Sequence, residues 1–243
     1  MPNPIKIRTE VISHTKLVDG VYLLVLAPER KKYRFYPGQF LHLALDAFDP
    51  NGGFWPDSRV FSIASAPESG SIEILYSVKG SFTSRMEKQI QLHDVLWIKY
   101  PYGNFIIENF IHDNNTEIVV IAGGTGISPF LSFFRSSDHI SFSNKISLYW
   151  GVKNPAIFNL LSTGDTMNDG RYDIHLYRES LDNNVIYPSS LGVIPIDDIY
   201  GMHGQNPNNV FFLSGPPSMV SKFKGFLLGK GIERENIIID DWE

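Results

Sequence analysis

The first hundred residues carry their apolar side chains in short alternating runs, which is the pattern of half-buried β-strands. Glycine, proline and aspartate separate these runs. Several short strands divided in this way predict an antiparallel sandwich or barrel. One stretch differs, because Phe82, Met86 and Ile90 recur at helical spacing and predict a short helix over 81–92. The expected strands of this region are 21–26, 40–45, 60–63, 72–78 and 95–98.

After about residue 114 the apolar strands alternate with helical stretches. This alternation predicts a parallel sheet wound with helices on both faces. The expected order is strand 118–121, helix 128–134, strand 146–150, a helix after 154, strand 173–177, strand 210–213, helix 217–228 and strand 237–239. The polar stretch 111–116 is the natural boundary, so we expect an antiparallel β-barrel domain over 1–113 and an α/β doubly wound domain over 114–243.

Composition narrows the chemistry that this chain can perform. A formal net charge of −5 gives no electrostatic footprint for nucleic acid or an anionic membrane. The absence of cysteine excludes thiolate nucleophiles and an iron–sulfur cluster bound by these residues. The seven histidines show no metal-ligand spacing, so we propose no metal site. No apolar run approaches a membrane span and the start lacks a signal peptide's apolar core, so we expect a cytoplasmic protein. Separately, we expect a monomer.

Two glycine turns each join an apolar strand to a helix. Gly124-Thr125-Gly126 is followed by Pro129, which suits a first helical turn because its missing N–H costs nothing there. Free N–H groups and the helix dipole at such a turn favour an anion such as phosphate. Ser214-Gly215-Pro216 has the same form and would lie at the carboxyl end of the sheet, where open α/β folds bind ligands. Each turn is also compatible with a purely structural strand-to-helix connection.

A second anion site is predicted in the first domain. Arg59 supplies a cation from a strand, and strict alternation places it on one face with Phe61, while Ser62 faces the other side. The segment Lys79–Thr83 offers a helix N-terminus with hydroxyl groups, which suits a pyrophosphate. Taken alone, an arginine such as Arg59 is most often a solvated surface charge. Together the two segments indicate one anion, and the chain as a whole indicates two nucleotides.

The whole chain resembles the ferredoxin-NADP reductase superfamily of two-domain flavoproteins. The resemblance rests on motifs that occur here in the family's order: Tyr36-Pro37-Gly38-Gln39-Phe40, Arg59-Val60-Phe61-Ser62, Lys79-Gly80-Ser81-Phe82-Thr83, Tyr102-Gly103-Asn104-Phe105, Gly124-Thr125-Gly126-Ile127-Ser128-Pro129, Tyr149-Trp150-Gly151-Val152 and Ser214-Gly215-Pro216-Pro217.

The resemblance implies a barrel that binds FAD and a second domain that binds NAD(P). By analogy Arg59 pairs with the flavin pyrophosphate, Phe61 lies against the isoalloxazine ring and Ser62 hydrogen-bonds near flavin N5. The nicotinamide nucleotide would lie on Gly124, Thr125 and Gly126, and Ser214 would be catalytic together with Ser62. The further residues expected to contact the cofactors are Val60, Ile63, Lys79, Gly80, Ser81, Phe82, Thr83, Pro129, Arg178, Gly215, Pro216 and Trp242.

Two positions depart from the family pattern, and a third region bears on the choice of coenzyme. Phe61 replaces a usual tyrosine, and Ser214 stands where many members have a cysteine beside the nicotinamide. Arg178 would follow a strand ending near residue 176, at the place where members that use NADP bind the 2′-phosphate, and this favours NADPH. Glu179 beside it would repel a phosphate and accept a ribose hydroxyl, so NADH stays open. Trp242 would either cover the flavin or cap the sheet.

The function implied is an NAD(P)H-dependent flavoprotein reductase that passes electrons to a separate acceptor, such as ferredoxin, flavodoxin or an oxygenase component. Because the chain has no cysteine, that acceptor is external. Two alternatives remain open. One is a reductase that releases free reduced flavin. The other is an electron-transfer or sensor subunit that keeps its nucleotides and has weak catalysis.

Overall fold

The computed structural model describes residues 4–30, 34–111, 115–136, 143–161, 170–180 and 187–240. Contacts divide the chain into two compact units, Met1–Ile106 with Ser128–Ser136, and Ile107–Ile127 with Ser137–Asp241. This division changes at Ile107 and places Ser128–Ser136 with the first unit. The domain limits of 1–113 and 114–243 therefore stay a prediction.

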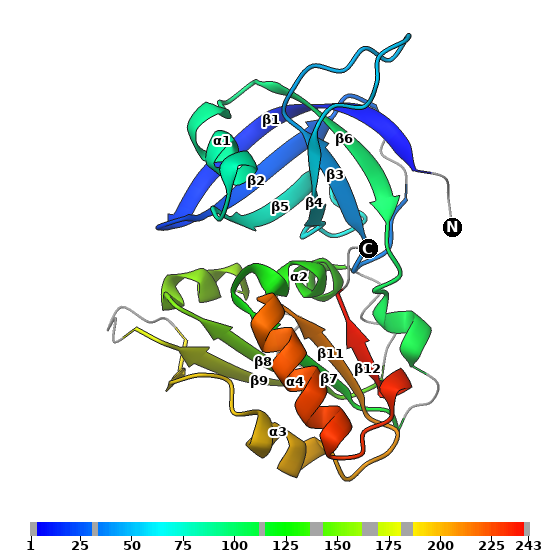
Figure 1. Ribbon diagram of the computed structural model, residues 1–243, viewed down its shortest axis with the longest axis vertical. Helices are drawn as coiled ribbons and strands as arrows, with labels where there is room; N and C mark the ends of the chain where they lie inside the picture. Colours follow the sequence, from blue (N-terminus) through cyan, green and yellow to red (C-terminus); the bar gives the residue numbers. More distant parts are fainter. Residues whose placement is uncertain are drawn as a thin grey trace. The chain divides into compact units, whose positions relative to one another are not determined.

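The first unit is built on a six-stranded antiparallel sheet with the order β4-β3-β6-β1-β2-β5 (Figure 1). Just beyond β4, the N–H of Ala64 donates to the carbonyl of Glu73 on β5 at 2.9 Å, so the two edges of the sheet meet. The predicted antiparallel barrel is thereby confirmed. Its elements are β1 (Ile5–Val18), β2 (Val21–Pro28), β3 (Phe40–Ala44), β4 (Ser58–Ser62), β5 (Ile72–Ser77), α1 (Ser81–Gln89) and β6 (Val95–Tyr102).

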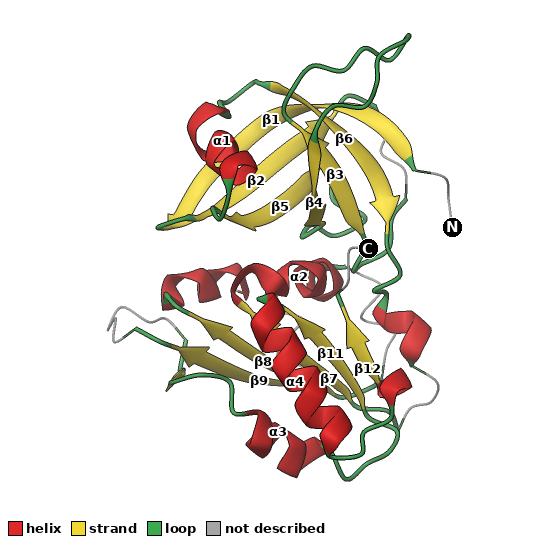
Figure 2. Cartoon of the chain, in the orientation of Figure 1, coloured by secondary structure: helices red, strands yellow, loops and turns green. Residues whose placement is uncertain are grey.

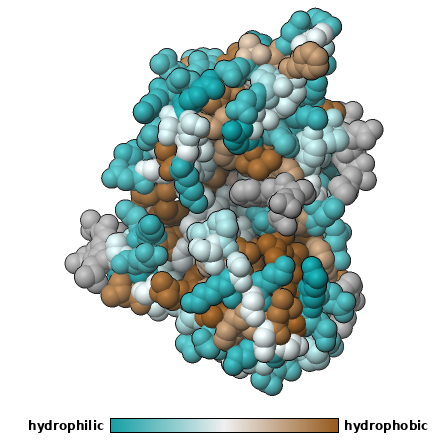
Figure 3. Space-filling view, in the orientation of Figure 1, coloured by the Kyte–Doolittle hydropathy of each residue, from teal (hydrophilic) through white to brown (hydrophobic). Residues whose placement is uncertain are grey.

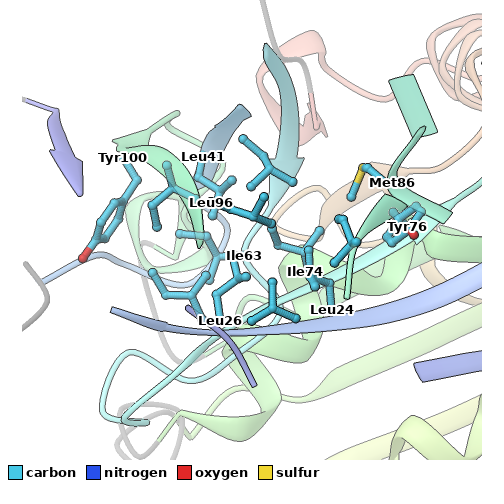
Figure 4. Close-up of a cluster of buried hydrophobic side chains, with 14 of the residues drawn as sticks. Leu24, Leu26, Leu41, Ile63, Ile74, Tyr76, Met86, Leu96 and Tyr100 are labelled. Atoms are coloured by element: carbon cyan, nitrogen blue, oxygen red, sulfur yellow. The ribbon is translucent and has the colours of Figure 1, made fainter. Parts of the chain in front are cut away.

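The inward-facing residues of these strands fill the barrel with aliphatic side chains (Figure 4). Leu24, Leu41 and Ile74 are fully buried there, as the period of two along a half-buried strand requires. Helix α1 adds Phe82 and Met86 to the same core. This helix ends at Gln89, three residues before the end that the sequence predicts, because Ile90 turns to an extended conformation.

The second unit is built on a six-stranded parallel sheet with the order β10-β9-β8-β7-β11-β12 (Figure 2). The predicted parallel strand pairing is confirmed. The elements from Ile107 onward, α2 included, are η1 (Ile107–Phe110), β7 (Ile118–Gly123), η2 (Gly124–Ile127), α2 (Ser128–Arg135), β8 (Ile146–Val152), η4 (Pro155–Leu161), β9 (Tyr172–Arg178), β10 (Ser190–Leu191), α3 (Ile196–His203), β11 (Val210–Ser214), α4 (Pro217–Gly229), η6 (Arg234–Asn236) and β12 (Ile237–Ile239).

Both faces of this sheet are covered. On one face, α3 and α4 bring Ile199 and Leu227 against the strands, and both side chains are fully buried. On the other face, Phe110 packs against Phe212 with ring centroids 5.8 Å apart. The doubly wound arrangement follows from strands that are apolar on both faces. Helix α3 was not predicted, because it is short and ends beside Gly204 without a long apolar period.

Two secondary features differ from the sequence prediction. The segment after Asn154 is the 3₁₀ helix η4, and the 3₁₀ turn η2 separates β7 from α2. Hydrophilic and hydrophobic residues are mixed on the face shown in Figure 3. Across the described ranges, no helix is long and apolar enough to cross a membrane.

Candidate functional site

Strand β4 presents Arg59 to solvent and buries Ser62. The Arg59 side chain is half exposed, whereas Ser62 is 5% exposed. The guanidinium carbon of Arg59 lies 5.2 Å from the centre of the Phe82 ring, and the Phe61 ring lies 6.4 Å from the same ring. Arg59 and Phe61 therefore share one side of the strand, as the alternation predicts. Val60 continues the strand between them, and Ile63 is fully buried just after it.

The start of α1, whose Phe82 ring packs against Arg59, carries a cluster of backbone donors. The Thr83 hydroxyl accepts hydrogen bonds from the N–H groups of Lys79 and Gly80 at 2.9 and 3.1 Å. The first helical bond runs from Ser84 N–H to the Gly80 carbonyl. The N–H groups of the first three helical residues, Ser81, Phe82 and Thr83, therefore have no acceptor within the helix. Thr83 shapes the turn, and these three N–H groups are the donors available to an anion.

Two contacts hold the C-terminal end of α1 on the barrel. The Tyr22 hydroxyl donates to the carboxylate of Glu87 at 2.8 Å. One ring nitrogen of His14 lies 3.2 Å from the carbonyl of Ile90, the residue that caps the helix, and burial lowers the pKa of this histidine. The helix is thus attached to the strands of the barrel, and a rigid scaffold of this kind favours precise positioning of a ligand.

Close backbone contacts at Gly38 join the segment Tyr36–Phe40 to the segment Tyr102–Phe105. Gly38 has a φ of +94°, and a Cβ at that position would lie 1.7 Å from the carbonyl oxygen of Phe105. The buried Gln39 side chain accepts from Tyr36 N–H at 2.9 Å and donates to the Gly103 carbonyl at 3.1 Å. This motif is therefore required for close backbone packing inside the first unit.

The turn after β7 combines an open glycine with tightly packed ones. Gly124 has a φ of +55°, and a Cβ added there would meet no atom within 4 Å. A Cβ on Gly126 would lie 2.5 Å from the Ser214 carbonyl oxygen and 2.6 Å from backbone atoms of Gly215. Two glycine turns therefore pack backbone against backbone, whereas the surface above Gly124 stays accessible. Trp150 fixes the turn by donating to the Gly124 carbonyl at 2.9 Å.

Four more predicted residues lie in or near these two turns. Thr125 belongs to η2, and Pro129 is buried in the first turn of α2 as expected. Pro216 is the exposed N-cap residue of α4. Gly215 has a φ of +149°, and a Cβ there would lie 2.9 Å from Gly123 N, so packing alone excludes a side chain.

Ser214 ends β11 and is almost fully buried. Its hydroxyl donates to a carboxylate oxygen of Asp240 at 3.0 Å. The Asp240 N–H in turn donates to the Leu213 carbonyl at 3.0 Å. Sequence reasoning missed Asp240, because the contact joins two strands that are separated along the chain and no local pattern marks it. Trp242, the other candidate near this end, lies outside the described residues.

The position of Arg178 corrects the sequence prediction. We expected it two residues after a strand ending near Leu176, but β9 continues through Arg178, which pairs with Val152 and Leu191. Pairing with β10 extends the strand, an effect that no local propensity signals. One amino group of Arg178 donates to the Ser180 carbonyl at 2.6 Å. Arg178 still lies at the carboxyl end of the parallel sheet, where such folds bind ligands.

A buried polar network lies elsewhere in the second unit, around Glu117. Its carboxylate contacts His203 at 3.0 Å and accepts from Ser147 at 2.8 Å. Burial acts to raise the pKa of Glu117, but the hydrogen bonds from His203 and Ser147 outweigh it and hold this pKa at about 2. The Tyr149 hydroxyl lies 2.7 Å from the other ring nitrogen of His203. All these partners are satisfied internally, so we assign the network a structural role.

The donor chemistry fits nucleotide phosphates. Around α1, three N–H groups, a glycine without neighbours at its Cβ position and a partly exposed arginine meet the needs of a pyrophosphate. In the second unit, the space above Gly124 lets a ligand approach the backbone closely. Among the described residues, no group of three or more histidine and acidic side chains could hold a metal ion.

Comparison with known proteins supports this interpretation. The oxidoreductase NAD-binding domain family matches residues 120–224. The reductase component of propane 2-monooxygenase from Mycolicibacterium goodii is 27% identical over 97% of this chain and 67% of its own length. The reductase component 1 of terephthalate 1,2-dioxygenase from a Comamonas species is 27% identical over 95% of this chain and 66% of its own length. The chain thus spans about two thirds of the length of these relatives.

A solved structure has the same fold over its full length. The ferredoxin NADP+ reductase from Neisseria gonorrhoeae with bound FAD and NADP superposes with a TM-score of 0.77, 18% identity, and coverage of 96% of this chain and 97% of that one. The antiparallel barrel and the parallel sheet with its glycine turns therefore share the fold of this reductase. In sequence the chain is similar to the reductase components of oxygenases, and its second half matches the oxidoreductase NAD-binding domain family.

Proposed function

We propose that this chain is an NAD(P)H-dependent flavoprotein reductase that binds FAD on its barrel and delivers electrons to a separate acceptor. The observation that carries the proposal is the start of α1, where three backbone N–H groups have no acceptor within the helix and the guanidinium carbon of Arg59 lies 5.2 Å from the centre of the Phe82 ring. A bound FAD would supply the hydride acceptor and electron donor of the reaction, chemistry that no side chain of this chain offers.

The residues proposed to hold FAD come from β4 and the start of α1. Arg59 neutralises the pyrophosphate, and Ser81, Phe82 and Thr83 donate their N–H groups to it. Phe61, flanked by Val60 and Ile63, supplies the apolar surface for the flavin ring. Lys79 and Gly80 form the turn whose shape Thr83 fixes. Phe82 is buried under Arg59 and so supports the arginine instead of stacking on adenine.

The turns after β7 and β11 are proposed to hold the nicotinamide nucleotide. Gly124, Thr125 and Gly126 approach its phosphates and ribose, while Pro129 starts the supporting helix. Gly215 and Pro216 form the second wall. Ser62 and Ser214 are the proposed catalytic residues: each carries a buried hydroxyl that can hydrogen-bond to a reacting ring.

For the coenzyme we propose NADPH, because Arg178 lies at the carboxyl end of the sheet with a guanidinium that can bind a 2′-phosphate. Glu179 next to it is exposed and favours NADH, so the preference is expected to be modest.

The proposed acceptor is a protein, by analogy with relatives that are named as reductase components of oxygenases. These 243 residues include no cysteine and therefore bind no iron–sulfur cluster among themselves. We propose that the protein acts in the cytoplasm as a monomer and without nucleic acid or a membrane as a partner.

The test is an anaerobic visible spectrum of the purified full chain, reconstituted with FAD where needed, before and after one equivalent of NADPH or NADH. Bleaching by either coenzyme supports the reductase, and the faster coenzyme identifies the preference. Flavin that binds without bleaching would favour a nucleotide-binding subunit with weak catalysis. Flavin that is released after reduction would favour a free-flavin reductase, and absence of flavin binding would contradict the assignment of Arg59.

A further inference from the structure

We infer that Asp57 is a positioning residue for Arg59: its carboxylate holds one side of the guanidinium and leaves the other side for a phosphate of the bound flavin nucleotide. This inference rests on the proposed function and adds a residue to it. Asp57 lies outside the motifs on which the family resemblance rests.

The hydrogen bonds of Arg59 are concentrated on one nitrogen. Nη1 donates to Asp57 Oδ1 at 2.5 Å and to the Ser58 carbonyl at 2.8 Å, which uses both of its hydrogens. Within the described part of the chain, Nε and Nη2 of Arg59 have no hydrogen-bond partner. Three N–H groups in a planar fork are therefore left, and this is the edge that binds phosphate in a bidentate manner.

A neighbouring arginine has the opposite arrangement. Arg85, on α1, donates through Nη2 to Asp46 Oδ1 at 2.7 Å, and its Nε donates to Gln89 at 3.3 Å. The edge of its guanidinium formed by Nε and Nη2 is therefore already hydrogen-bonded to other side chains. Asp46 and Asp57 lie at the two ends of the connection between β3 and β4. Asp46 links this connection to α1 through Arg85, and Asp57 orients Arg59.

The ion pair between Arg59 and Asp57 is too exposed to contribute much to the stability of the fold. The two side chains are 50% and 62% exposed, and pairs of this kind contribute little to folding. A negative charge beside an anion site also opposes binding of the anion. A positioning role and a merely competing charge therefore predict opposite effects when the side chain is removed, which makes the inference testable.

The experiment measures the dissociation constants of FAD and of riboflavin for the full chain freed of bound flavin, in the wild type, Asp57→Ala and Asp57→Asn. Asparagine keeps an oxygen that can accept from Arg59 and removes the charge. We expect Asp57→Ala to weaken FAD binding by about fivefold to tenfold, because Arg59 loses its fixed orientation. We expect Asp57→Asn to bind FAD at least as tightly as the wild type. Riboflavin has no phosphate, so its affinity should be the same in all three proteins.

Two controls separate positioning from general damage. Asp19→Ala removes an exposed carboxylate that pairs with Lys16 elsewhere on the barrel and should leave FAD affinity unchanged. In an Arg59→Ala background, Asp57→Ala should have no further effect, because Asp57 acts through Arg59.

Several outcomes would overturn the inference. Equal tightening by Asp57→Ala and Asp57→Asn would show that Asp57 only competes with the phosphate, and unchanged affinity in both would show that it has no role. A parallel loss of riboflavin affinity would indicate structural damage. If the wild type binds neither flavin, the proposed function itself fails, and this result differs from all the others.

Discussion

The hydroxyl of Ser214 donates a hydrogen bond to the carboxylate of Asp240, with the two oxygens 3.0 Å apart at the carboxyl ends of β11 and β12. This contact fixes the rotamer of the residue that we propose for catalysis. A thiol is a weaker hydrogen-bond donor than a hydroxyl, so a cysteine here would be held less strongly by Asp240 and freer to contact the nicotinamide.

Ser214→Cys is therefore expected to raise the rate at which the coenzyme reduces bound flavin by about tenfold, equivalent to ~1.4 kcal/mol of barrier. Stopped-flow absorbance under anaerobic conditions measures this rate, and Ser214→Ala serves as the size-matched control with a rate at or below that of the wild type. Equal rates in all three proteins would mean that position 214 does not contact the reacting groups.

Arg59→Ala is expected to weaken FAD binding by about 1.5–3 kcal/mol, the range for a charge-assisted hydrogen bond. Arg85→Ala also removes one positive charge, in this case from α1. Because the Arg85 guanidinium is already bonded to Asp46 and Gln89, the loss of FAD affinity should be several times smaller than for Arg59→Ala. Quenching of flavin fluorescence gives both affinities. Equal losses in the two variants would indicate that only the overall charge matters.

Arg178→Ala is expected to raise the KM for NADPH by roughly tenfold or more, because a guanidinium bonded to a phosphate contributes about 1.5–3 kcal/mol. The KM for NADH should stay within about twofold, since NADH has no 2′-phosphate, and about 0.4 kcal/mol corresponds to such a change. Lys222→Ala, which removes an exposed cation from α4, is the control. If both coenzymes lose affinity equally, Arg178 does not recognise the 2′-phosphate.

Gly126→Ala and Gly124→Ala are expected to destabilise the fold by different amounts, because the first introduces a steric clash and the second an unfavourable backbone conformation. A methyl group on Gly126 would lie 2.5 Å from the Ser214 carbonyl oxygen, so we expect a loss of about 2–3 kcal/mol of unfolding free energy. Gly124 has open space but a φ of +55°, so its alanine variant should lose only about 1 kcal/mol. Denaturant unfolding measures both changes, and a larger loss for Gly124→Ala would contradict the packing account.

Acid is expected to destabilise the second unit through Glu117. The pKa of this carboxyl is about 2 in the folded protein and lies near 4.5 as an ordinary value. Because the folded value is the lower one, its contribution to stability is fully present above pH ~5 and is lost as the pH falls from about 5 to 2. Glu117→Gln should be less stable at pH 7 and should lose less stability over that pH range, as measured by urea unfolding at each pH. Equal acid sensitivity in both proteins would exclude Glu117 as the titrating group.

The sequence by itself determined the class of fold and the approximate position of both proposed ligand sites. Alternation with a period of two gave the barrel strands, and buried apolar runs separated by helical stretches gave the parallel sheet, since both signals are local. Glycines followed by Pro129 and by Pro217 marked the two strand-to-helix turns, because these residues suit such turns wherever they occur.

Only the tertiary structure decided which of these residues are available to a ligand. Gly126 packs against the backbone of the turn that follows β11, whereas Gly124 faces open space. Among the described residues, the edge of the Arg85 guanidinium formed by Nε and Nη2 is bonded to side chains, whereas the same edge of Arg59 is not. The partners that make these differences, Asp240 for Ser214 and Asp46 for Arg85, lie far away along the chain. Side-chain pairing of this kind depends on how distant strands and helices are brought together, and no local periodicity or propensity records it.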